Sequence, residues 1–91
     1  MPKVIITASV EDAKKWEKGF RTHADLFRKQ TSTSMDFTVT DDNVAVLCTE
    51  VTDLDKFKKV IASQETAEAM AVDGVKRGTV QIYSLDKDLP L

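Results

Sequence analysis

The stretch WEKGFRTHADLF, residues 16–27, gathers most of the residue types in this chain that could do chemistry. It holds the only His and the only Trp of the chain, two of its four Phe and one of its three Gly. His is the side chain that most readily exchanges a proton near neutral pH, so His23 is the one candidate, a weak one, for a catalytic residue. An imidazole beside aromatic rings could orient a substrate or move a proton at the mouth of an apolar pocket.

A plainer interpretation competes for each of these residues. Trp16, Phe20 and Phe27 recur at helical spacing, which is typical of the buried face of a helix. His23, at the margin of that face, is more often a boundary residue bonded to backbone or solvent. Gly19 inside the helix costs about 1 kcal/mol relative to Ala. Either the glycine permits close approach of a neighbour or a ligand, or the helix simply tolerates it. The sequence therefore predicts core and a cavity wall, with a ligand pocket lined by Trp16, Gly19, Phe20, His23, Phe27 and Met70.

Other reactive residue types are sparse. Cys48 is the only Cys, so no internal disulfide forms, and within an apolar strand we expect it to be a buried, inert thiol. One His and one Cys fall short of a metal site, so we expect no metal. The chain has no Gly-rich phosphate loop, Cys-x-x-Cys or G-x-S-x-G motif, and we expect no cofactor.

Length and charge limit the class of protein. The 91 residues fit a single domain spanning 1–91. A net charge of −2 does not favour nucleic acid. The N-terminus MPKVIITASV lacks the pattern of a signal peptide, and no apolar run approaches the ~18 residues that span a bilayer. These features predict a cytoplasmic protein without a membrane or nucleic-acid partner.

Apolar patterns predict four strands. KVIITASV (3–10) and VAVLCTEV (44–51) are apolar on both faces, MDFTVT (35–40) alternates, and TVQIYSL (79–85) is the last strand. The acidic and amide residues at 41–43 are typical of a turn between strands.

The segments between the strands have helical patterns. A capping box of Ser9 and Asp12 is expected to open one helix that continues to about Gln30. A similar pair, Thr52 and Asp55, is expected to open the next helix, in which Leu54, Phe57 and Ile61 share one face. Ser63 then caps a short helix over 64–72, and Gly74 stops it in the left-handed conformation.

The order β-α-β-β-α-β predicts an α+β, ferredoxin-like fold, a four-stranded antiparallel sheet with two helices on one face. In this topology the first and third strands are central, and both are apolar on both faces. The face without helices would be an association site, and a second copy is its simplest cover. We therefore expect a homodimer through the sheet faces, with Ile6 and Val46 as interface candidates, depending on which face of each strand points outward.

The stretch EVTDLDKFKKVIASQETAEAMAVDGV, residues 50–75, has features of a known group of proteins. In order along the chain, this stretch has an acidic residue at the end of the third strand and an Asp at the start of a helix. That helix has a Phe on its inner face, and a Ser-x-Glu sequence, a Met and a Gly-Val pair follow. With the strand order, this resembles the dimeric α/β-barrel (antibiotic-biosynthesis-monooxygenase-like) superfamily, in particular its small uncharacterised bacterial members. The resemblance implies a barrel formed by two sheets packed face to face.

The resemblance implies several activities rather than one. Some members of the group oxidise aromatic polyketides without a cofactor, some degrade haem, some isomerise lactones, and some have no known activity. The haem-degrading members carry an Asn on the first strand and a His on the second helix. Here the first strand offers Thr7 and Ser9, and the second helix has no His, which argues against haem.

Three classes of function remain open at this point. The first is a cofactor-independent monooxygenase-like or isomerase-like enzyme acting on an apolar or aromatic small molecule. The second is a non-catalytic module that binds such a molecule, and the third is a homo-oligomeric interaction protein. A ligand screen separates the first two classes from the third, and a turnover assay separates the first from the second.

Overall fold

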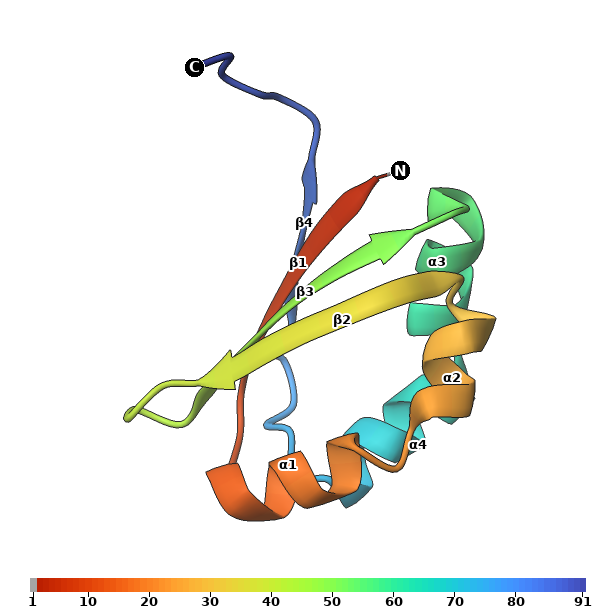
Figure 1. Ribbon diagram of the computed structural model, residues 1–91. Helices are drawn as coiled ribbons and strands as arrows, with labels where there is room; N and C mark the ends of the chain where they lie inside the picture. The colour runs from red at the N-terminus through yellow and green to blue at the C-terminus, as the bar shows by residue number, and fades with distance from the viewer. Residues whose placement is uncertain (1) are drawn as a thin grey trace.

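The computed structural model describes residues 2–91 as one four-stranded antiparallel sheet with its helices on one face (Figure 1). The strands lie in the order β2-β3-β1-β4, so the two apolar strands are central, and the predicted α+β ferredoxin-like fold is confirmed. Its elements are β1 (Lys3–Ser9), α1 (Ala13–Phe20), α2 (Ala24–Lys29), β2 (Ser32–Val39), β3 (Val44–Val51), α3 (Leu54–Ile61), α4 (Gln64–Val72) and β4 (Gln81–Leu85).

The alternation of side chains along β1 and β3 decides which residues face the helices. Ile6 pairs with Leu47 of β3 on one side and with Ile82 of β4 on the other. Ile6 and Leu47 are buried on the helix-covered face. The neighbouring positions Ile5 and Val46 therefore point to the opposite face, which no helix covers (Figure 1).

The single helix expected from Ser9 to Gln30 is wrong, because the chain breaks it into α1 and α2. The Thr22 hydroxyl donates to the carbonyl of Gly19 at 2.6 Å, and His23 becomes the N-cap of α2 with φ −100° and ψ 25°. A Thr side chain that bonds local backbone offers the chain an alternative to the helix. The break turns His23 out of the helical register that its spacing predicted.

The helix N-termini are also displaced from their expected caps. Asp12 accepts from the backbone N–H groups of Lys14 and Lys15, and Asp53 accepts from that of Lys56. Ser9 instead ends β1. A carboxylate at a helix N-terminus combines a hydrogen bond with a favourable interaction with the helix dipole, which accounts for the preference of Asp over the nearby hydroxyl residues.

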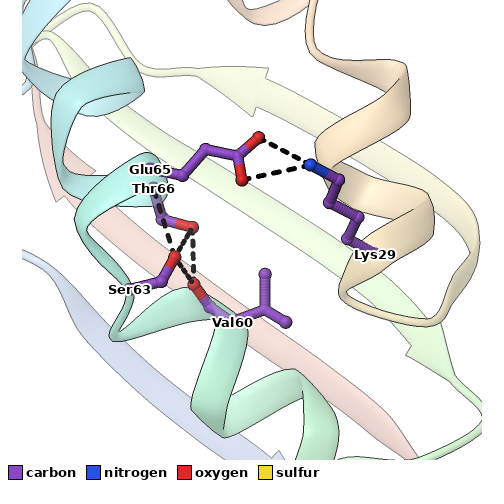
Figure 2. A network of polar contacts seen from close by, with 5 residues as sticks. All are labelled: Lys29, Val60, Ser63, Glu65 and Thr66. Atoms are coloured by element: carbon purple, nitrogen blue, oxygen red, sulfur yellow. Dashed lines mark hydrogen bonds and ion pairs between the residues drawn. The ribbon is translucent and has the colours of Figure 1, made fainter.

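The start and end of α4 agree with the sequence prediction. The Ser63 hydroxyl accepts from the backbone N–H of Thr66, and Gly74 follows the helix with φ +81°. The hydroxyl of Thr66 donates to the carbonyl of Val60 at 2.6 Å, which ties α4 to the end of α3 (Figure 2).

An ion pair joins α2 to α4 across the helix layer. Lys29 Nζ lies 3.0 and 3.2 Å from the two carboxylate oxygens of Glu65 (Figure 2). Both side chains are more than half exposed, so this pair contributes little to stability. None of the helices within residues 2–91 is long and apolar enough to cross a membrane.

The orientation of α3 is tested most directly at Phe57. This side chain lies between the helices and the sheet and has no exposed surface. Phe57→Ala is expected to lower the free energy of unfolding by about 3–5 kcal/mol, since it removes buried contacts and leaves a cavity. Denaturant unfolding followed by circular dichroism measures the change. The matched control is Lys58→Ala on the exposed side of the same helix, for which a change within about 0.5 kcal/mol is expected. Equal effects of the two changes would contradict the assigned orientation of α3.

Candidate functional site

A cavity of about 60 Å³ lies between the helix layer and the sheet. All four helices or the residues beside them contribute to its wall, and the floor is the helix-covered face of the sheet, including Ile6 and Leu47. Most of the lining side chains are apolar. The polar side chains among them are His23, Gln30, Thr66 and Asp73.

Five of the six residues predicted to line a pocket do line this cavity, namely Trp16, Phe20, His23, Phe27 and Met70. Leu26, from the same predicted flank, joins them. The rings of Trp16 and Phe20 stack with centroids 4.6 Å apart, and Phe27 lies 4.9 Å from Phe20. The aromatic residues are thus core and cavity wall at once, so the two interpretations of the stretch 16–27 are compatible.

The imidazole of His23 is hydrogen-bonded to another side chain. Its Nε2 atom lies 2.8 Å from Oδ2 of Asp73, which immediately follows α4. The His23 side chain is 24% exposed, whereas that of Asp73 is only 6% exposed. The pair therefore joins a buried carboxylate to an imidazole at the border of the cavity. The sequence did not single out Asp73, because an acid before a helix-stopping Gly is unremarkable as a pattern.

Gly19 is the sixth predicted residue, and it lies behind the pair rather than on the cavity wall. A Cβ atom on Gly19 would sit 1.9 Å from Oδ1 of Asp73. The missing side chain is what lets the carboxylate lie against α1. The expectation that Gly19 permits close approach of a neighbour is confirmed, and the neighbour is Asp73.

Gln30 is a second polar residue that the sequence prediction missed. It is 3% exposed and lines the cavity, so its side-chain amide is a polar group on a mostly apolar wall. An amide both donates and accepts hydrogen bonds, so a polar atom of a ligand could bond to it. Thr66 also lines the cavity, but its hydroxyl is already bonded to Val60.

The remaining candidates lie away from this cavity. Cys48 is half-buried on the helix-free face of β3, so the expected full burial is wrong for the isolated chain. Ile6 is 5% exposed beneath the helices, so its predicted place in a sheet-face interface is wrong. Its neighbour Ile5 and Val46 point to the helix-free face. No three His, Cys, Asp or Glu side chains among residues 2–91 converge as metal ligands would.

Comparisons with known proteins bear on the fold. No protein-family model matches the sequence, and no curated protein is significantly similar to it. Solved structures that share the fold include several antibiotic biosynthesis monooxygenases. A candidate monooxygenase of this kind from Caulobacter crescentus has a TM-score of 0.70 at 20% identity, over 97% of this chain and 90% of that one.

Two further structural neighbours come from Streptomyces. SnoaB, a cofactor-independent oxygenase from Streptomyces nogalater, has a TM-score of 0.69 at 18% identity, over 99% of this chain and 97% of its own. A monooxygenase from the gene ActVA-Orf6 of Streptomyces coelicolor, solved with the ligand nanaomycin D, has a TM-score of 0.64 at 11% identity, over 99% and 89% of the two chains. Identities this low establish a common fold, and the chemistry has to be argued from this chain's own residues.

The contact between Gly19 and Asp73 predicts a coupled effect on stability. Gly19→Ala should destabilise the chain by about 1–3 kcal/mol, because the new methyl group displaces a buried carboxylate, although Ala favours a helix by up to about 1 kcal/mol. In an Asp73→Ala background the space is empty, and the same change should be neutral or stabilising. Denaturant unfolding of the four variants measures the coupling. Additive effects would contradict the contact.

Proposed function

We propose that this protein binds a small apolar or aromatic molecule in the cavity between its helices and sheet. The observation that carries the proposal is a buried apolar cavity bordered by one polar pair, His23 and Asp73. Small-molecule sites combine apolar walls with a few placed polar groups in this way. The amide of Gln30 gives the cavity a further hydrogen-bonding group.

The size of the cavity limits how a ligand enters. A dry apolar cavity of about 150 Å³ accommodates benzene, whereas this one measures about 60 Å³. An aromatic ligand must therefore displace part of the lining. The half-buried side chains of Met35, Met70 and Phe27 are suited to this, because Met side chains in particular adopt many conformations at low cost.

We further propose that the bound molecule is a substrate, and that the protein is a cofactor-independent oxygenase-like or isomerase-like enzyme. The likeness in fold to SnoaB and to the ActVA-Orf6 monooxygenase supports a reaction of this class. The polar pair at the cavity border supports proton transfer as a part of it. A non-catalytic binding module is the alternative, favoured by the small number of titratable groups that line the cavity.

The proposed assembly is a homodimer through the helix-free face of the sheet. Ile5, Cys48 and Tyr83 form a row across that face, since Ile5 pairs with Cys48 on β3 and with Tyr83 on β4. Tyr83 is 49% exposed and Leu85 is 51% exposed. Apolar side chains in the middle of a sheet are association sites, and a second copy offers a matching face.

The ligand proposal predicts that filling the cavity weakens binding. Ala69 lines the cavity from α4, whereas Ala67 is exposed on the same helix. In a thermal-shift screen of small aromatic compounds, hits should raise the melting temperature of the wild type and of Ala67→Leu. Ala69→Leu should lose about tenfold or more in affinity through overlap with the ligand. Equal affinity for all three proteins would place the ligand elsewhere.

A turnover assay on the same hits then separates enzyme from binding module. Oxygen consumption and product analysis are measured in metal-free buffer without added cofactor. Product formation with the wild type supports the enzyme, whereas binding without turnover across the hits supports the binding module.

In the proposed dimer, Cys48 lies on the helix-free sheet face that the second copy covers, so its reactivity reports on dimer formation. Light scattering should give a dimer for the wild type and for Val72→Lys on the exposed side of α4, but a monomer for Val46→Lys, because burying a Lys in the interface is costly. A thiol reagent should label Cys48 slowly in the dimer and rapidly in the folded monomer. A wild-type monomer at tens of micromolar would count against the interface.

A further inference from the structure

We propose that the outer edge of β2, together with α1, is a docking groove for an extended segment of another protein, which adds to the sheet as a further strand. The segment that fits this groove carries apolar side chains and a carboxylate on the face that meets α1. This inference concerns a different surface from the cavity, and it does not depend on the function proposed for the cavity.

A groove of about 550 Å³ lies between α1 and β2. β2 is the outermost strand of the sheet, and its one neighbour among the strands within residues 2–91 is β3 (Figure 1). The groove is therefore a free strand edge with a helix beside it. The residues that line it are Ala13, Lys14, Glu17 and Arg21 of α1 and Met35, Asp36, Phe37, Thr38 and Val39 of β2.

The backbone of β2 directs alternate residues to this free edge. In an antiparallel pair, every second residue points both its N–H and its C=O at the neighbouring strand. The N–H of Thr40 donates to the carbonyl of Val44 at 2.9 Å, so Thr40 is directed toward β3. The register is regular over residues 35–39, and the N–H and C=O groups of Met35, Phe37 and Val39 therefore point outward. A free edge of this kind is a template for pairing with another chain.

The same three residues form the floor of the groove. Met35, Phe37 and Val39 are half-buried, and their side chains pack against the core, since alternate residues of a strand face the same side of the sheet. The Phe37 ring is held by Phe20 and Trp16, with ring centroids 4.9 and 5.7 Å away. This part of β2 thus combines outward backbone groups with a fixed apolar floor, the two features by which sheet edges bind extended peptides.

The α1 side of the groove carries a net positive charge. Nε of Arg21 lies 3.0 Å from Oε2 of Glu17, and the guanidinium carbon lies 5.1 Å from the centroid of the Phe37 ring. The charge of Arg21 is therefore matched inside the groove, whereas none of the ion pairs found in residues 2–91 includes Lys14. Asp36 belongs to the opposite face of the strand. A carboxylate on the docked segment would complement Lys14.

A short synthetic peptide tests the groove directly. In acetyl-TVTETVT-amide, two Val and one Glu share one face of the extended chain, and the Thr residues share the other. The peptide should bind in isothermal titration calorimetry. In hydrogen exchange followed by NMR, it should newly protect the amides of Met35, Phe37 and Val39. The amides of Asp36 and Thr38 point to β3 and should be protected with or without the peptide.

Methylated peptides assign the binding to the strand edge. In an antiparallel addition, the peptide residues directly opposite Met35, Phe37 and Val39 point their N–H groups at β2. N-methylation of the Val and Glu amides should therefore weaken binding about tenfold or more. N-methylation of the same number of Thr amides, which face away from β2, should leave the affinity nearly unchanged.

A charge exchange tests the class of segment. Lys14→Glu should weaken acetyl-TVTETVT-amide about fivefold or more and should strengthen acetyl-TVTKTVT-amide, because the sign of the unmatched charge in the groove is reversed. The matched control is Lys15→Glu, an exposed neighbour on α1 that does not line the groove, for which the wild-type preference is expected. Circular dichroism confirms that both variants are folded.

Three results would overturn the inference. The first is absence of binding by acetyl-TVTETVT-amide, or an equal loss of affinity from the two methylation patterns. The second is protection of the amides of Met35, Phe37 and Val39 in the protein alone, because a second copy or the chain's own tail would then already cover the edge. The third is an unchanged preference for Glu over Lys in folded Lys14→Glu.

Discussion

A single layer of apolar side chains between sheet and helices holds this chain together. Val4, Val51 and Phe57 have no exposed surface, and they come from β1, β3 and α3. The four helices have six to nine residues each, and helices this short are not stable alone in water. They exist because each one lays a few apolar side chains on the sheet. Polar groups placed in so thin a layer must find partners inside it.

His23 and Asp73 are such a pair of polar partners, and they lie at the border of the cavity. Asp73 follows α4 directly and its side chain is only 6% exposed, and the hydrogen bond to His23 compensates part of its desolvation. The pair joins the end of α4 to the start of α2. The same contact that joins the two helices therefore also places an imidazole and a carboxylate at the cavity border.

The sequence predicted the sheet better than the helices, and the physical reason is the range of the interactions. The apolar runs of β1 and β3 are local patterns, and β3 begins and ends where expected, at Val44 and Val51. The break between α1 and α2 depends on a bond from Thr22 to Gly19 that competes with the helix, and local spacing does not show which of the two wins.

Only those residues of the candidate site that lie on one apolar helical stripe were predictable from the sequence. Trp16 and Phe20 share that stripe, so their meeting at one cavity follows from spacing, whereas His23 reaches the cavity from the N-cap of α2, beyond the break. Asp73 and Gln30 reach the same cavity through tertiary packing, and neither residue type signals this in sequence. Similarly, alternation showed that Ile5 and Ile6 face opposite sides, but only the position of the helices shows which side is open.

The contact between Gly19 and Asp73 also constrains how this sequence can diverge. A Cβ at position 19 and a carboxylate at position 73 cannot occupy the same space. A lineage that acquires a side chain at position 19 must therefore move, shorten or remove the one at position 73, and this disturbs its hydrogen bond to His23. The two positions are far apart in the chain, yet they should covary among relatives, and a histidine at position 23 should persist only where glycine and an acid occur together.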